Sequence, residues 1–270
     1  MRNAKHVPTR MADAPDPAPQ ESKRPDSGES ATGDTTLTLP EAVLLLALGD
    51  EEGSVEVGDR AALPFGLAAA VLLTLAARGR IRHENDLWTV VDDTPTGDSA
   101  LDSPLRAMAD EDEPRGTMHW LRTLPSVTAA DEGDEDGGNE DGLRDHMLRR
   151  LTDEGVLEKE DHRFLGVYSY QRYPTVDPDP EQRVRARIRQ VVLEGEAPDD
   201  RALALIALMD ACGLTHDVFE DEERDAAADR LDELTEDARM GRTVSSVDAE
   251  TTAAVLTATS AATAAATNPL

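Results

Sequence analysis

Cysteine and lysine are scarce in this chain of 270 residues. Cys212 is the only cysteine, so the chain can form neither an internal disulfide nor a cysteine-based metal cluster. Lysine occurs only at Lys5, Lys23 and Lys159, so arginine supplies nearly all of the 27 basic residues. Any phosphate recognition by this chain would therefore rest on guanidinium groups.

Long hydrophobic runs are also missing. Met1 to Arg10 contain no apolar core of the kind that a secretory signal needs. The longest uncharged internal stretch, Ala61 to Ala77, contains Pro64 and falls at the lower edge of the roughly 17–25 residues that a spanning helix requires. The sequence predicts a buried core helix here and a cytoplasmic protein.

Signatures of catalysis and metal binding are absent from the sequence. We find no phosphate-binding glycine-rich loop followed by lysine, no zinc-protease motif and no nucleophile elbow. The six histidines share no helical spacing, and the acidic stretch from Asp131 to Asp141 lacks the glutamate that completes a calcium loop. We therefore predict a non-enzymatic protein with no metal site and no cofactor.

Acidic residues dominate the charge. The chain has 56 of them and a formal net charge of −29, far more than solubility alone requires. Concentrated salt would screen the self-repulsion of such a surface. The composition predicts a halophilic protein.

Residues 1–35 are rich in polar residues and proline and have almost no large apolar side chain, which predicts a disordered acidic and polar tail. A single domain is expected over residues 36–265. Ordered structure should begin at Thr38, where Pro40 and Glu41 favour a capped helix start.

Hydrophobic periodicity predicts mostly helices, some buried on all sides and others amphipathic, together with two small β-hairpins. Gly66–Ala77 and Arg201–Cys212 are apolar on all sides and should be the buried helices. Other helices are expected at Val43–Leu48, 99–108, around Trp120, 143–152, 181–193, 222–240 and 248–264.

A pattern of helix, glycine stop and hairpin occurs twice. The first hairpin should turn at Asn85-Asp86. The second should pair Val156-Leu157 with Phe164–Tyr170.

Four aromatic residues, Phe164, Tyr168, Tyr170 and Tyr173, gather in or near the second hairpin. Alternate strand residues pack into a core, so one interpretation is ordinary core packing. The other is a tip that dips apolar side chains into a membrane interface. Arginines supply the possible phosphate-binding groups nearby, namely Arg78, Arg80, Arg82, Arg144, Arg149 and Arg150.

Several segments, in this order, resemble the Golgi phosphoprotein 3-like family over about residues 36–260. They are Leu37–Leu48, Gly66-Leu67, Leu75–Ile81, Pro95–Asp98, Leu101-Asp102, Leu151–Leu157 and Arg201–Leu208. The resemblance implies a mainly α-helical domain: a buried helical bundle ringed by amphipathic helices, with two small β-hairpins. Eukaryotic members of the family bind the head group of phosphatidylinositol 4-phosphate, insert an apolar hairpin into the Golgi membrane and link glycosyltransferase tails to a vesicle coat.

Four positions of this sequence match the family's head-group site, at about Asp59, Ala68, Asp141 and Arg144. Only Arg144 keeps the family's residue type. Phe164, Leu165 and Tyr168 fall at the inserting hairpin. The resemblance thus implies a peripheral adaptor on the inner face of the cell membrane, with a lipid head group and membrane-protein tails as partners. This interpretation requires Phe164 and Leu165 to form an outward-facing tip beside Arg144.

Two other classes of function stay open. A helix followed by a hairpin is also how winged-helix DNA-binding modules look, although Gly66–Ala77 has no basic or polar side chain that could reach a base edge. Nucleic acid is therefore an unfavoured partner. The last alternative is a protein–protein scaffold without a ligand, and the oligomeric state does not follow from the sequence.

Overall fold

The computed structural model describes residues 37–48, 61–127, 142–164, 168–240 and 249–267. The chain divides into two units, residues 1–34 and 35–270, and all described residues lie in the second. The expected tail and the acidic stretch 131–141 lie outside the described residues.

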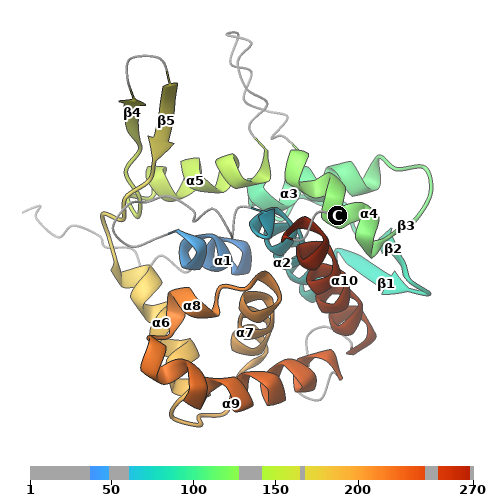
Figure 1. Ribbon diagram of the computed structural model, residues 1–270. Coiled ribbons are helices and arrows are strands. Elements are labelled where there is room, and N and C mark those ends of the chain that lie inside the picture. Colours follow the sequence, from blue (N-terminus) through green and yellow to red (C-terminus); the bar gives the residue numbers. More distant parts are fainter. Residues whose placement is uncertain (1–36, 49–60, 128–141, 165–167, 241–248, 268–270) are drawn as a thin grey trace, which may run out of the picture. The chain divides into compact units, whose positions relative to one another are not determined.

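The described part is mainly helical, as predicted, with two small antiparallel sheets (Figure 1). Its α-helices are α1 (Leu39–Ala47), α2 (Leu63–Ala77), α3 (Ser99–Ala109), α4 (Thr117–Thr123), α5 (Leu143–Asp153), α6 (Asp179–Val192), α7 (Asp200–Cys212), α8 (Thr215–Val218), α9 (Asp221–Arg239) and α10 (Ala249–Thr267). A short 3-10 helix, η2 (Leu124–Ser126), follows α4. The strands are β1 (Ile81–Glu84), β2 (Leu87–Val90), β3 (Arg115–Gly116), β4 (Glu160–Phe164) and β5 (Tyr168–Arg172).

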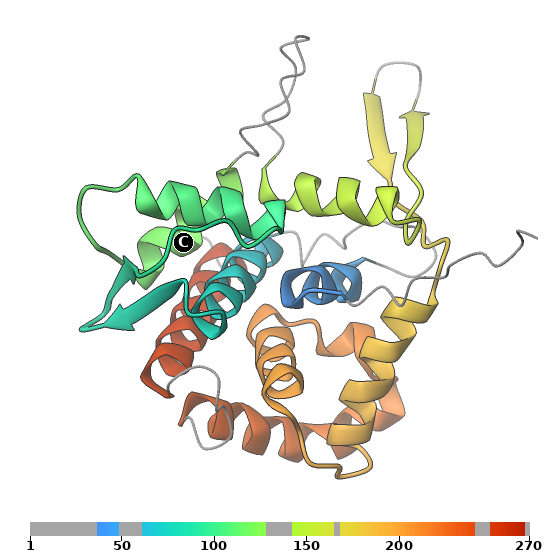
Figure 2. The same cartoon turned by 180° about the vertical axis from the view of Figure 1, so that it is seen from behind.

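Helix α2 lies at the centre of the bundle. Its alanine, leucine and valine side chains are buried around most of its circumference, and α1, α4, α7 and α10 all pack against it. Both views show these helices gathered around α2 (Figures 1 and 2). The burial confirms the prediction of a core helix, although α2 begins at Leu63 rather than Gly66.

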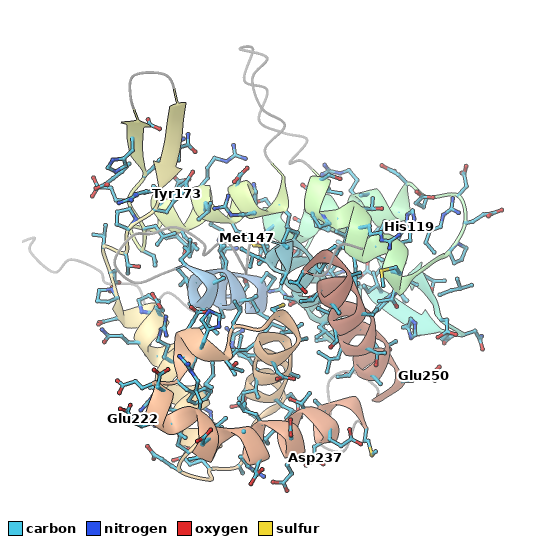
Figure 3. All side chains as sticks on the ribbon, in the orientation of Figure 1. His119, Met147, Tyr173, Glu222, Asp237 and Glu250 are labelled. Atoms are coloured by element: carbon cyan, nitrogen blue, oxygen red, sulfur yellow. The ribbon has the colours of Figure 1, made fainter. Side chains whose placement is uncertain are left out.

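Amphipathic helices surround this core. Helix α6 buries Ile188, Val191 and Val192 and exposes Arg183. Helix α9 buries Leu231 and Leu234 and is otherwise largely charged. Glu222 and Asp237 project from α9 in Figure 3. These helices confirm the predicted ring.

The first hairpin is β1 with β2, turning at Asn85 and Asp86, which both have positive φ as a tight two-residue turn requires. The inner face holds Trp88, whose indole Nε1 donates to Thr117 Oγ1 at 3.0 Å. Strand β3, which the sequence did not reveal, adds a third strand at β2.

The second hairpin differs from the prediction. Strands β4 and β5 pair Glu160 with Arg172 at one end and Phe164 with Tyr168 at the other. Val156 and Leu157 are buried below it and belong to its stem, where Leu157 bridges Thr175. The polar residues 160–163 form a strand because backbone pairing in an exposed hairpin needs no apolar face.

The pattern of helix, glycine stop and hairpin, which the sequence shows twice, is present in the backbone. Gly79 ends α2 and Gly155 ends α5, each with φ near the left-handed helical value, at 67° and 75°. After each glycine the next amide donates back into the helix, Arg80 N to Leu75 O and Val156 N to Leu151 O. The same helix stop therefore precedes both hairpins.

Candidate functional site

Helix α5 carries Arg144 and leads into the second hairpin. Its inner side buries Leu143, Met147, Leu148 and Leu151 against the bundle, and Figure 3 shows Met147 on that side. A Cβ at Gly142, before the helix, would lie 2.4 Å from the carbonyl oxygen of Pro125. Glycine therefore lets the start of α5 pack closely on η2.

Arg144 lies in the first turn of α5 with its side chain partly exposed. Its guanidinium Nη1 is 3.2 Å from the carboxylate of the adjacent Asp145. Exposed pairs of this kind contribute little free energy, so a phosphate oxygen can replace the carboxylate at small cost. Asp145 would still repel an anion, which limits the affinity of such a site.

The second hairpin stands away from the helices in both views (Figures 1 and 2). Within the described residues, β4 and β5 pair only with each other. Phe164 and Tyr168 form the last pair of the ladder, at the end opposite to the stem. Leu165 and the side chains of Phe164 and Tyr168 lie outside what the structure describes.

Arg144 and the hairpin lie at opposite ends of α5. The hairpin follows the last turn of the helix, whereas Arg144 is in the first. Arg144 and Asp153 are nine positions apart, which corresponds to about 14 Å along the helix axis. The structure does not bring the guanidinium next to the hairpin.

Of the other positions matched to the head-group site, the structure describes only Ala68. Ala68 is fully buried in α2. Asp59 and Asp141 lie outside the described residues. Of the expected arginines, Arg80 pairs with Asp92 and Arg82 lies 3.5 Å from Glu84.

Arg150, in the last turn of α5, contacts three carboxylates, those of Glu41, Asp98 and Glu154. We call these four residues the Arg150 cluster. Its Nε lies 3.1 Å from Glu41 and 3.0 Å from Glu154, and its Nη1 donates to Asp98 at 2.7 Å. Burial alone would lower the pKa of Arg150, but the hydrogen bond to Glu154 and the charges of the other two carboxylates raise it. The guanidinium is thus committed to these partners.

Glu41 is the buried member of this cluster, with no exposed side-chain surface. One of its oxygens accepts from the amide and the hydroxyl of Thr38, both at 2.7 Å. Arg201, on α7, donates to the carbonyl of Leu37 at 2.7 Å, and burial lowers its pKa while Asp199 and Glu41 counteract that effect. Charges on α5 and α7 thereby hold the start of α1.

The sequence did not predict this cluster, although Glu41, Asp98 and Glu154 lie in segments that resemble the family. Thr38-x-x-Glu41 was readable as a capping box, and that box is present. The second role of Glu41 and the link to Asp98 join residues far apart in the chain, and no local pattern reveals them.

Neither a metal site nor a spanning helix is found in the part of the chain that the structure describes. No group of three His, Cys, Asp or Glu side chains there could hold a metal ion. None of the described helices is long and apolar enough to cross a membrane.

These features define a mainly α-helical protein with two surface elements that could bind a partner, the outer side of α5 and the protruding hairpin. The chain belongs to the Golgi phosphoprotein 3 (GPP34) family, whose model matches residues 39–266. It is also similar to the vacuolar protein sorting-associated protein 74 of Eremothecium gossypii, with 29% identity over 173 residues. That match covers 60% of this chain and 51% of the relative, so the chain spans about half the length of that protein. The resemblance found in the sequence is confirmed.

Proposed function

We propose that this chain is a non-enzymatic peripheral membrane adaptor on the inner face of the cell membrane. The second hairpin inserts Phe164, Leu165 and Tyr168 into lipid, and Arg144, which lies at the other end of α5, binds a phosphate of a lipid head group such as phosphatidylinositol 4-phosphate. The two are separate contacts with the membrane rather than the single site that the sequence predicted. Membrane-protein tails are the partners that it would connect.

One observation carries this proposal: the hairpin projects from the helices, and Phe164 and Tyr168 form the ladder's last pair, far from its stem (Figure 1). Aromatic and leucine residues at such an end suit the membrane interface. Membership of the GPP34 family supports the same interpretation.

The charge of the chain decides which force can drive docking. A net charge of −29 repels anionic lipid. In about 1 M salt the Debye length is about 3 Å, so long-range attraction and repulsion both become small. Apolar insertion then drives binding, and Arg144 acts only at short range.

Flotation with liposomes in high KCl tests the hairpin. We expect the native protein to float with phosphatidylcholine vesicles and Phe164→Ser/Leu165→Ser to remain at the bottom of the gradient. Leu87→Ser/Val91→Ser is the matched control, because it removes two exposed apolar side chains from the other hairpin. Absence of the native protein from the lipid layer would rule out membrane docking and leave the scaffold alternative.

A second arm tests the head group. Arg144→Gln should reduce flotation only on vesicles that contain phosphatidylinositol 4-phosphate, because the guanidinium contributes a charge-assisted contact to phosphate. Arg122→Gln, which removes an exposed arginine of α4, is the control. Equal flotation of native protein and Arg144→Gln on both vesicles would exclude Arg144 from the site.

The winged-helix alternative requires α2 to be an exposed recognition helix. Helix α2, which would have to enter the major groove, is covered by α1, α4, α7 and α10. A helix enclosed on these sides presents no side chain to a base edge.

A further inference from the structure

We infer that Arg150 is a positioning residue for the second hairpin: with Glu41 and Asp98 it fixes the end of α5 from which the hairpin projects, and so sets the pose in which the hairpin meets a membrane. The inference rests on the proposed function, since it concerns how the docking element is held.

Arg150 connects three separate helices at one point. It lies on α5, Glu41 lies in the first turn of α1, and Asp98 is the N-cap of α3, where it also accepts from the amide of Ala100. We call this meeting point of α1, α3 and α5 the junction. Removing the side chain of Arg150, Glu41 or Asp98 would break the contact of α5 with at least one of the other two helices.

The junction is linked to the hairpin through a short rigid path. Glu154 is the C-cap of α5, and Gly155 turns the chain so that the amides of Val156 and Leu157 both donate to Leu151 O. The side chains of Val156 and Leu157 are both buried. The end of α5 and the start of the stem therefore move as one body.

Backbone hydrogen bonds in the stem fix the two strands of the hairpin relative to the end of α5. Glu158 N donates to Pro174 O, and Val176 N donates to Val156 O, so both arms are tied to the residues just after α5. Tyr173, at the base of the hairpin in Figure 3, is buried as well.

Beyond the stem, the structure describes no further strand partner for β4 or β5. A two-stranded hairpin held only at its base takes its direction from that base. The direction of the hairpin is therefore set where α5 is anchored, at the Arg150 cluster.

Arginine suits this role because its planar fork can meet several carboxylates at once. Lysine at this position would keep the charge next to Glu41 but could not maintain the contacts to α1 and α3 together. Arg150→Lys is therefore the informative variant, since it loosens the junction but keeps a positive charge beside the buried Glu41.

Asp98→Asn is the second variant. Asparagine is as good an N-cap as aspartate, so α3 keeps its start while the charge facing Arg150 is lost. The matched control is Arg189→Lys, which weakens an arginine that joins α6 to Glu223 of α9. Circular dichroism confirms that each variant is folded.

The experiment has two readouts. The first is a spin-label distance between Glu160→Cys on β4 and Ala261→Cys on α10, in a Cys212→Ala background. We expect a narrow distribution for the native junction and a broadened or shifted one for Arg150→Lys and Asp98→Asn. Arg189→Lys should leave it unchanged.

The second readout is flotation with phosphatidylcholine vesicles in high KCl. We expect Arg150→Lys to bind about fivefold more weakly than native protein, which corresponds to roughly 1 kcal/mol, while Arg189→Lys binds normally. If native protein does not float, the proposed function fails, and the distances still decide whether the cluster positions the hairpin. Unchanged distances in both variants, or a changed distance with unchanged flotation, would overturn the inference.

Discussion

His83 is a buried imidazole whose two ring nitrogens have no hydrogen-bond partner in the described part of the chain. Its ring packs 4.9 Å from that of Trp88. Burying polar nitrogens without a partner costs about 1–3 kcal/mol, more than the ring contact returns. We expect His83→Leu to raise the free energy of unfolding by about 1 kcal/mol, measured by urea denaturation. His119→Leu, at a partly exposed site, should change it little, and a loss of stability in His83→Leu would contradict this account.

Arg189 and Glu223 join α6 to α9 and predict a pH dependence. The hydrogen bond from Arg189, 2.6 Å long, is the main cause that holds the pKa of Glu223 below its usual value of 4.5. A pKa lowered by folding means that the pair stabilises the protein above that usual value and that the contribution is lost as pH falls through the lowered pKa.

Glu223→Gln tests this sign, because glutamine preserves the capping box of α9. We expect its melting temperature to lie below that of native protein at neutral pH and the difference to shrink as pH falls through the lowered pKa of Glu223. Glu222→Gln, on the exposed side of α9, should show no such convergence. A constant difference at every pH would show that the carboxylate charge is not responsible.

At the scale of elements, the crossing of α2 and α7 depends on Gly66. A Cβ at this position would lie 2.4 Å from Cys212 Sγ. We expect Gly66→Ala to lower the free energy of unfolding by about 1–3 kcal/mol through overpacking, despite the better helix propensity of alanine. Cys212→Ala removes the sulfur and should restore most of that loss in the double variant.

The double-mutant cycle, measured by urea denaturation, separates this contact from other effects of either change. A coupling energy of about 1–2 kcal/mol in favour of the double variant is expected. Additive effects would mean that the helices shift apart to admit the methyl group without involving the thiol.

Except for the short α8, the α-helices of this fold could be predicted because they have local signatures. Apolar residues surround α2, and one-sided patterns mark α6 and α9. The second hairpin was misplaced for a physical reason: the apolar pair Val156-Leu157 looks like a strand, whereas its burial comes from packing below the stem. The Arg150 cluster was not predicted because its ion pairs depend on tertiary packing: Asp98 and Arg150 are 52 positions apart in the sequence.

At the scale of the whole molecule, the excess of carboxylates is the dominant electrostatic feature. Several lie in a row on the exposed side of α9, where Asp221, Asp225, Asp229 and Asp232 follow at helical spacing. Like charges at such spacing destabilise a helix. Within α9, Arg224 pairs with Asp221 and Arg230 with Glu233, while Arg187 on α6 pairs with Glu196 and Asp199. Solvent ions must therefore screen much of the charge of Asp225, Asp229 and Asp232.

We therefore expect the melting temperature to rise between about 0.1 M and about 2 M KCl, as the Debye length falls from about 10 Å to about 2 Å. Salt also strengthens apolar burial, so a charge variant is needed to separate the two effects. Asp225→Asn/Asp229→Asn/Asp232→Asn should be more stable than native protein at low salt and should gain less from added KCl. If both proteins gained equally, screening of this surface would not be the cause, and a melting temperature independent of KCl would contradict adaptation to high salt altogether.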